Sequence, residues 1–166
     1  MTRPVTTPTR RALLKSTALG LCAIALSPPR LRAAERFEVE HSDDEWRKLL
    51  TPDQFAVLRK SATERPYTSP LLHEERAGIF GCVGCQRDLF SSTTKFDSRT
   101  GWPSFWAPLD KAVGTSRDTS FGTVRTAVHC ARCGGHLGHV FDDGPKPTGL
   151  RYCMNGLALT FKPAAA

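Results

Sequence analysis

The sequence predicts a small, mainly antiparallel β domain that begins with two short helices. Helical spacing of apolar residues is confined to a stretch near residues 43–58, whereas from Gly78 onward Gly, Asp and Pro divide the chain into short segments. The 166 residues suffice for one ordinary domain and a short appendage. Two widely separated C-x-x-C pairs add a predicted link between distant parts of that domain.

Two helices are predicted ahead of the β segments. The first is indicated by two acidic residues followed by helically spaced apolar side chains. These residues are Asp43, Asp44, Trp46, Leu49 and Leu50. Thr51 then supplies an N-cap and Pro52 a first helical position. Phe55 and Leu58 would share one face of this second helix, which a polar connector at residues 61–70 follows.

The predicted strands are short apolar segments bounded by turn-forming residues. Residues 77–80, 124–128 and 157–161 have the β-branched and aromatic content typical of strands. Residues 142–145, Asp-Asp-Gly-Pro, predict a turn. These segments favour a β domain over a helical one.

The first 34 residues have the features of a cleavable export signal. They hold six of the 23 Lys and Arg residues and no Asp or Glu, leaving 17 basic and 16 acidic residues for the rest. Arg10 and Arg11 precede a mostly apolar stretch and a site of small residues. The paired arginines resemble the twin-arginine export signal. We expect residues 35–166 to be the mature domain, and the protein to be periplasmic or secreted.

The charge distribution also restricts the partners of the mature domain. Because the basic excess lies in residues 1–34, we expect no nucleic-acid binding. An uncleaved membrane anchor is the alternative to a signal peptide, but the apolar run at residues 16–26 is short for a membrane span. We therefore expect no stable membrane insertion after cleavage.

Four of the six cysteines have the spacing of a structural zinc site. The pairs are Cys82 with Cys85 and Cys130 with Cys133. Four thiolates can surround one zinc ion tetrahedrally and leave no open position for catalysis. In an oxidising compartment the same residues could instead form two disulfides. We favour zinc because of the spacing, and because a protein exported in the folded state can acquire its metal in the cytosol.

Cys153 has no cysteine partner once Cys22 is removed with the leader. Such a thiol is either a buried bystander or a reactive group, and its neighbours alone leave both interpretations open. A nearby guanidinium favours the nucleophilic thiolate. In a strand, Arg151 and Asn155 would each share a face with Cys153.

Two further motifs are not informative by themselves. His136 and His139 lie three residues apart, but as metal ligands they are superfluous beside four cysteines, and an isolated pair is most often ordinary surface or core. Residues 101–106, Gly-Trp-Pro-Ser-Phe-Trp, gather aromatic and turn-forming residues, which most often mark a buried corner.

Together these segments resemble the type B methionine sulfoxide reductases over roughly residues 42–162. The matching stretches are residues 50–55, 95–98, 101–105, 130–133, 135–145 and 151–155. Each is unspecific alone, but the combination is specific. The resemblance implies antiparallel sheets packed as a small sandwich or barrel-like domain with N-terminal helices. One structural zinc ion per chain would be held by Cys82, Cys85, Cys130 and Cys133.

The resemblance further implies the thiol-dependent reduction of methionine-R-sulfoxide residues in proteins. The Cys153 thiolate would attack the sulfoxide sulfur and become a sulfenic acid. His139 is the preferred proton donor for the oxygen, with His136 or water assisting. Asn155 would hold the oxygen or a bridging water by hydrogen bonding.

The same resemblance assigns the substrate side of the site. Trp102 would take the S-methyl group, with Phe105 supporting the wall and Arg151 also lining the site. Thr100 stands where many members of the family have a cysteine that resolves the oxidised nucleophile. We therefore expect an external reductant, a thioredoxin-like protein or a small thiol, and a monomeric enzyme.

Two other functions remain compatible with the motifs. A zinc-stapled binding module would bury Cys153 and perform no chemistry, and a thiol–disulfide oxidoreductase would use a C-x-x-C pair. The number of reactive thiols separates them: one with zinc retained for the reductase, none for the module and two for the oxidoreductase.

Overall fold

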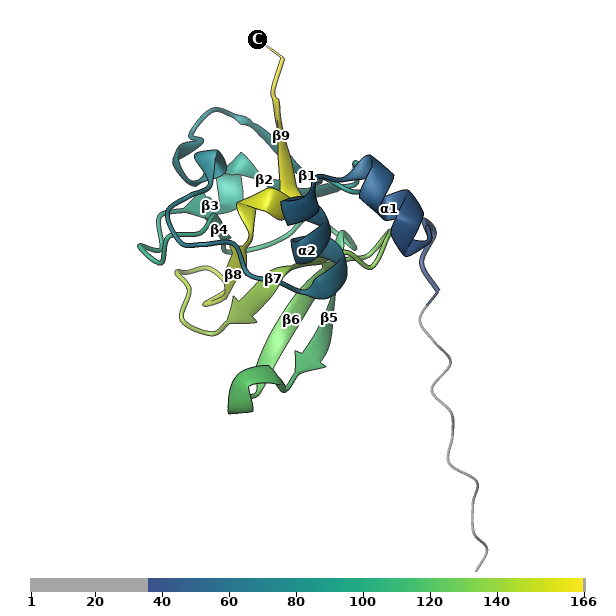
Figure 1. The fold of residues 1–166 in the computed structure, drawn as a ribbon. Coiled ribbons are helices and arrows are strands. Elements are labelled where there is room, and N and C mark those ends of the chain that lie inside the picture. The colour runs from purple at the N-terminus through teal and green to yellow at the C-terminus, as the bar shows by residue number, and fades with distance from the viewer. Residues whose placement is uncertain (1–35, 166) are drawn as a thin grey trace, which may run out of the picture. The chain divides into compact units, whose positions relative to one another are not determined.

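The computed structural model of the chain describes residues 36–165 (Figure 1). The predicted export signal lies outside these residues. Between residues 36 and 165 no helix has the length and apolar character needed to cross a membrane.

Two helices precede the strands, as the sequence predicts. Helix α1 spans Asp43–Leu49 and helix α2 spans Pro52–Lys60. Each begins with a capping box, in which the Ser42 or Thr51 hydroxyl accepts a backbone amide and the N3 side chain accepts the cap amide in return. Trp46 is the buried residue of α1, whereas Leu49, the last residue of this helix, is 60% exposed.

Two antiparallel sheets form the body of the domain. The smaller has the order β2 (Asp88–Ser91), β1 (Gly78–Cys82) and β9 (Leu159–Pro163). The larger has the order β3 (Lys95–Phe96), β4 (Ser104–Phe105), β8 (Arg151–Met154), β7 (His136–Phe141), β6 (Arg125–Cys130) and β5 (Val113–Asp118). Short 3-10 helices occur at η1 (Pro70–His73), η2 (Ser92–Thr94), η3 (Ser120–Gly122) and η4 (Gly156–Ala158).

The mainly antiparallel β prediction is confirmed, with one boundary corrected. The strands expected near residues 77–80 and 124–128 are β1 and β6. The segment 157–161 is a strand only from Leu159, because the preceding residues form η4, whose amides donate to the Glu64 carboxylate.

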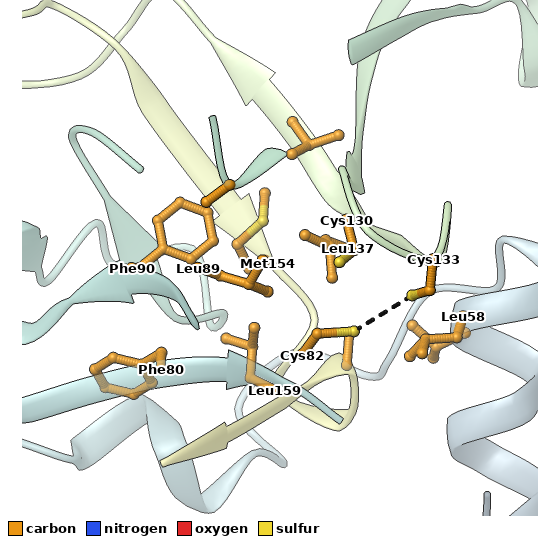
Figure 2. Close-up of a cluster of buried hydrophobic side chains, with 14 of the residues drawn as sticks. Leu58, Phe80, Cys82, Leu89, Phe90, Cys130, Cys133, Leu137, Met154 and Leu159 are labelled. Carbon is orange, nitrogen blue, oxygen red and sulfur yellow. Dashed lines mark hydrogen bonds between the residues drawn. The ribbon is translucent and has the colours of Figure 1, made fainter. Parts of the chain in front are cut away.

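Aromatic side chains from both sheets meet in the core. Phe105 of β4 stacks on Phe90 of β2, with ring centroids 4.4 Å apart, and meets Phe80 of β1 edge-on at 5.0 Å. Such pairs contribute about 0.5–1.5 kcal/mol each beyond the burial of their area. Figure 2 shows the same core continuing to Leu58 of α2 and the cysteines at the ends of the strands. The two sheets are therefore packed face to face, with α2 in contact with β7 and η4.

Candidate active site and metal centre

The four paired cysteines lie at two turns of the same geometry. Cys82 ends β1 and Cys130 ends β6. After the first pair the amide of Gln86 donates to the carbonyl of Cys82, and after the second the amide of Gly134 donates to the carbonyl of Cys130, both at 2.9 Å. Gln86 and Gly134 both have the positive φ that closes such a turn, 61° and 68°. Each turn therefore presents two sulfurs to the same point.

The four sulfurs have the spacing that a tetrahedral ion requires. Sγ of Cys82 is 3.7 Å from Sγ of Cys133, and Sγ of Cys85 is 3.5 Å from Sγ of Cys130; all four lie within 4.8 Å of one another. Zinc–sulfur bonds of about 2.3 Å place sulfurs about 3.8 Å apart. The cysteines are free thiols rather than two disulfides. The cluster could hold a metal ion that ties β1 to β6.

Crowding of the thiols is itself an argument for a cation. Hydrogen bonding from neighbouring thiols lowers the pKa of Cys130, whereas hydrogen bonding and burial raise the pKa of Cys82. Four thiolates at this spacing repel one another, so that all four ionise together only around a cation. The donor set consists of sulfur alone, which suits zinc.

A row of paired residues crosses the larger sheet and carries Cys153. Across successive strands, Ser104 is opposite Cys153, Cys153 opposite His139, His139 opposite Ala127, and Ala127 opposite Ser116. Residues opposite one another in a sheet place their side chains on the same face. Cys153, partly exposed, is therefore next to His139 although 14 positions separate them in sequence.

A small pocket opens over this row. Its volume is about 110 Å³, and its lining includes Cys153, His139, Trp102 and Asn155. Gly138, which also lines the pocket, has no room for a side chain because a Cβ atom would meet the carbonyl of Cys153. The pocket is thus lined by a thiol with an imidazole beside it, and by an indole and an amide side chain.

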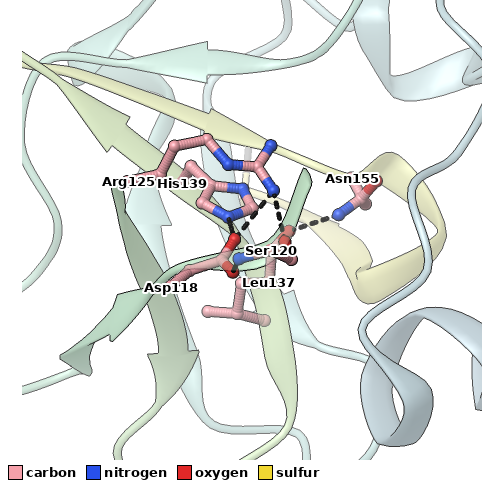
Figure 3. Close-up of polar contacts among 6 residues, drawn as sticks. All are labelled: Asp118, Ser120, Arg125, Leu137, His139 and Asn155. Atoms are coloured by element: carbon pink, nitrogen blue, oxygen red, sulfur yellow. Dashed lines mark hydrogen bonds and ion pairs between the residues drawn. The ribbon is translucent and has the colours of Figure 1, made fainter. Parts of the chain in front are cut away.

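His139 is held by an acidic partner that the sequence did not indicate. Its Nε2 lies 2.7 Å from Oδ2 of Asp118, which also accepts from Arg125 at 2.7 Å (Figure 3). Hydrogen bonds from the Ser120 amide and hydroxyl, and then the contact with His139, hold the pKa of Asp118 far below its usual range. Asp118 therefore stays an anion, and it holds the His139 ring in place through Nε2.

His136 has a different environment. It is 8% exposed, and its ring is 5.4 Å from that of His139. Burial, with a smaller contribution from the neighbouring His139, lowers the pKa of His136 from 6.5 to about 4. His136 is therefore neutral near pH 7, and of the two histidines only His139 lies within ion-pair distance of a carboxylate.

One buried residue, Glu64, connects three parts of the site. Its amide donates to Oδ1 of Asn155 at 2.9 Å, and its carbonyl accepts the indole N–H of Trp102 at 2.9 Å. Its carboxylate accepts the amides of Gly156 and Leu157. Burial raises the pKa of Glu64 above 4.5 despite these bonds. The orientation of Trp102 and of Asn155 thus depends on the same residue.

The comparison with known proteins gives the family. A family model described as the SelR domain matches residues 50–163, which contain every element described here except α1. The chain belongs to this family.

Curated relatives align with most of this chain, and the three described below have the same name. A protein of Pseudomonas putida (strain W619) is 54% identical over 127 residues, which are 76% of this chain and 96% of the relative. Proteins of Agrobacterium fabrum and Methanosarcina barkeri are each 51% identical, over 76% and 75% of this chain and 94% and 88% of their own lengths. All three are named peptide methionine sulfoxide reductase MsrB. The resemblance inferred from the sequence is confirmed at the level of the family.

The SelR fold brings most, but not all, of the predicted residues to the pocket. Phe105 does not reach it: Ser104 shares the face of Cys153, so that Phe105 points into the core, where it is fully buried. Asn155 lines the pocket, but its Nδ2 donates to the carbonyl of Leu137 and its Oδ1 accepts from Glu64. Its role toward the substrate oxygen stays a prediction.

Arg151 lies near Cys153 but is not among the residues that line the pocket. Its guanidinium donates two hydrogen bonds of 2.8 Å each to the Asp143 carboxylate. Its Cζ lies 4.4 Å from the centroid of the Phe141 ring. The pKa of Arg151 is raised mainly by Asp143 and also by the charge of Cys153. Asp143 and Phe141 thus hold the positive charge of Arg151 near the Cys153 thiol. No role was assigned to either residue from the sequence.

Thr100 lies next to Cys153. Its hydroxyl oxygen lies 3.7 Å from Sγ of Cys153 and 2.8 Å from the hydroxyl of Ser98, which in turn lies 2.7 Å from the hydroxyl of Ser104. A chain of hydroxyls therefore runs beneath the thiol. Asp118, Glu64 and Thr63 complete the SelR site without any motif in the sequence that marks them.

Proposed function

We propose that this chain reduces methionine-R-sulfoxide residues in proteins to methionine, with Cys153 as the nucleophile. The observation that carries the proposal is the position of Cys153, partly exposed in a pocket of about 110 Å³ and directly opposite His139 in the sheet. Membership of the SelR family and relatives named peptide methionine sulfoxide reductase support it.

The reaction requires a soft nucleophile and a proton. The Cys153 thiolate donates an electron pair to the sulfoxide sulfur while His139 supplies a proton to the oxygen. The oxygen is transferred to Cys153 as a sulfenic acid, and the sulfur leaves as the thioether of methionine. Because Nε2 of His139 faces Asp118, the proton that is transferred lies on Nδ1. His136, neutral near pH 7, assists by hydrogen bonding.

Selectivity for the R epimer follows from the two unlike walls of the pocket. Trp102 receives the methyl group, and the side of His139 and Asn155 receives the oxygen. Exchanging the two groups presses an unsatisfied oxygen against the indole, which costs about 1–3 kcal/mol for each lost hydrogen bond. The S epimer is therefore reduced at least about fivefold more slowly.

The cysteine cluster is proposed to hold one structural zinc ion per chain. Cys82, Cys85, Cys130 and Cys133 supply all four ligands, so that the ion stabilises the junction of the sheets and takes no part in the reaction. Zinc content of one per chain, measured on protein purified without chelators, supports this, and its absence contradicts it.

Recycling is proposed to need an external thiol. Thr100 has no sulfur, and the other four cysteines of the described chain are in the cluster. A thioredoxin-like protein or a small thiol therefore attacks the sulfenic acid of Cys153 directly.

The location is proposed from residues 1–34 alone. They act as a twin-arginine signal that is removed on export, and the mature domain works as a monomer in the periplasm or outside the cell, without membrane insertion. Changing Arg10 and Arg11 to Lys should leave an unprocessed chain in the cytoplasm. Normal processing of that variant contradicts the proposal.

The decisive assay compares the two epimers. The mature domain is given peptides that contain either methionine-R-sulfoxide or methionine-S-sulfoxide, with dithiothreitol as the reductant. We expect methionine to form from the R epimer, and one reactive thiol per chain before the reaction. If neither epimer is reduced, or if no thiol reacts, a binding module is the better interpretation.

A further inference from the structure

The catalytic pocket opens into a second, larger hollow on the same face of the sheet. The hollow has a volume of about 590 Å³, and it shares Thr63, Arg125 and His139 with the pocket around Cys153. It extends from His139 toward β5, the edge strand of the larger sheet. We call this hollow the edge groove.

The edge groove is hollow because the residues of the paired row have short side chains there. Beyond His139 the row continues with Ala127 and then Ser116, so that short side chains follow the imidazole toward the edge. One wall is the end of α2 and the connector after it, through Lys60 and Thr63. The groove is thus a continuation of the row that carries the nucleophile.

The two cavities have volumes that suit different parts of a substrate. About 110 Å³ accepts the end of one methionine sulfoxide side chain, whereas about 590 Å³ lies in the range of sites that hold drug-sized molecules. A reductase for free methionine sulfoxide has no use for the larger space. A polypeptide whose oxidised side chain enters the pocket has neighbouring residues that need a place.

The charges around the edge groove favour an acidic occupant. Its charged lining consists of the three cations Lys60, Arg117 and Arg125 and the single anion Asp118. Asp118 is already shared by Arg125 and His139. Lys60 contacts Asp43 at 2.6 Å, but with that acid counted the cations still outnumber the anions. The lining histidines, His129, His136 and His139, can only add positive charge.

We propose that the edge groove binds the polypeptide segment next to the oxidised methionine and prefers segments with acidic side chains. This inference rests on the proposed reductase function and specifies its substrates. The segment crosses β7, β6 and β5 in turn, with its acidic side chains toward the cationic lining. The preference is electrostatic, so that it weakens as salt screens the charges.

The test uses three peptides that differ only beside methionine-R-sulfoxide, where they carry Glu, Gln or Lys. With dithiothreitol as reductant, we expect kcat/KM to fall from the Glu to the Gln to the Lys peptide, by up to about fivefold per step at low salt. The differences should shrink at high salt. Equal kcat/KM for the three peptides, or the reverse order, overturns the proposal.

A pair of variants locates the effect. Ser116→Glu puts an anion on the groove floor, whereas Thr93→Glu puts it on η2, outside the lining of both the groove and the pocket. Both positions are exposed, so that both variants should fold. We expect Ser116→Glu to lower the ratio of Glu-peptide to Lys-peptide kcat/KM severalfold and Thr93→Glu to keep it. Equal changes in the two variants place the preference elsewhere and overturn the assignment.

A substrate without neighbours separates this proposal from the one on which it rests. The unmodified domain should reduce N-acetyl-methionine-R-sulfoxide, which fills the pocket and leaves the edge groove empty. If that compound is reduced and the three peptides react alike, the reductase function stands and the groove assignment is wrong. If neither the compound nor any peptide is reduced, both are wrong.

Discussion

Cys130 and Cys153 lie in the same six-stranded sheet, on strands separated only by β7. Cys130 is fully buried at the end of β6, where three other sulfurs surround it. Cys153 is partly exposed within β8, next to an imidazole, a hydroxyl and a guanidinium. Sulfur neighbours make a cysteine a metal ligand, whereas a pocket lined by proton donors makes it a nucleophile.

The two histidines of β7 repeat the contrast over three residues. His136, near the cysteine turn, is buried and neutral near pH 7. His139, opposite Cys153, pairs with Asp118. The strand thus passes from a part of the molecule that supports the fold to a part that performs chemistry, and substitutions along it should separate stability from activity.

Exchanging each type of cysteine for serine gives the largest effects. In Cys130→Ser one of four ligands is lost, and structural zinc contributes about 10–16 kcal/mol, as much as or more than the stability of a typical domain. We expect loss of zinc and loss of the cooperative thermal transition. Cys153→Ser should retain zinc and the melting temperature but abolish reduction of the R epimer, because a hydroxyl has too high a pKa to act as the thiolate does.

Three measurements on both variants are sufficient: zinc content, melting temperature and turnover with dithiothreitol. A stable, zinc-containing Cys130→Ser protein contradicts the assignment of the metal centre. Activity of Cys153→Ser at the level of the unmodified chain contradicts the assignment of the nucleophile.

The pairing of Asp118 with His139 should account for the next largest effect. Asp118→Asn removes the carboxylate that holds the His139 ring in place, and we expect kcat to fall about 10²-fold, at the low end of general acid contributions. The thiol of Cys153 should still react with iodoacetamide. Asp88→Asn is the matched control, because Asp88 pairs with Lys162 on the smaller sheet, and it should keep full activity. If Asp118→Asn kept the kcat of the unmodified chain, the proton would have to come from a group that does not depend on Asp118.

The contrast between these residues shows what the sequence could predict. The cysteines proposed as metal ligands are pairs only three positions apart, so that local spacing was enough to predict that they could hold a metal ion. Asp118 contacts His139 across 21 positions and through the register of β5, β6 and β7, which no local pattern encodes. Trp102 lines the pocket, its role toward the substrate stays a prediction, and its hydrogen bond to Glu64 was not predicted.

Phe105 shows a second reason for failure. Strand β4 contains only Ser104 and Phe105, too short for an alternating pattern to reveal which of them faces the nucleophile. A shift of one residue moves a side chain to the opposite face of a sheet, and here it moves Phe105 from the pocket to the core. Helix caps, by contrast, depend on neighbouring residues, and the cap at Thr51 was predicted correctly.

His136 should make stability depend on pH. Its pKa is about 4 in the folded protein and about 6.5 in the unfolded chain, so that the unfolded state binds more protons between these values. The stabilisation is complete above pH 6.5 and is lost as the pH falls toward 4, by up to about 3 kcal/mol. His136→Gln should flatten this part of the curve of unfolding free energy against pH. Parallel curves for the two proteins would contradict the assignment.

The smallest expected change in rate belongs to Thr100→Cys, which should alter the product rather than the first step. After one turnover without reductant, the unmodified mature domain should carry one added oxygen atom, as the sulfenic acid of Cys153. Thr100 Oγ1 lies 3.7 Å from Sγ of Cys153, so that a thiol at this position needs a small movement to reach the disulfide distance of about 2.0 Å. The variant should therefore lose two hydrogens and show a peptide that links residues 100 and 153.

Thr123→Cys is the control for that exchange, because Thr123 is exposed and lies outside the pocket lining. It should retain the sulfenic acid product. A disulfide in the unmodified protein after turnover would mean that a cysteine of the metal centre reaches Cys153, and it would have to do so with release of zinc. Zinc content and intact mass measured on the same sample decide between the sulfenic acid and a disulfide to the metal centre. The proposed scheme requires that no cysteine of the metal centre forms a disulfide with Cys153, so that zinc stays bound while one oxygen is added.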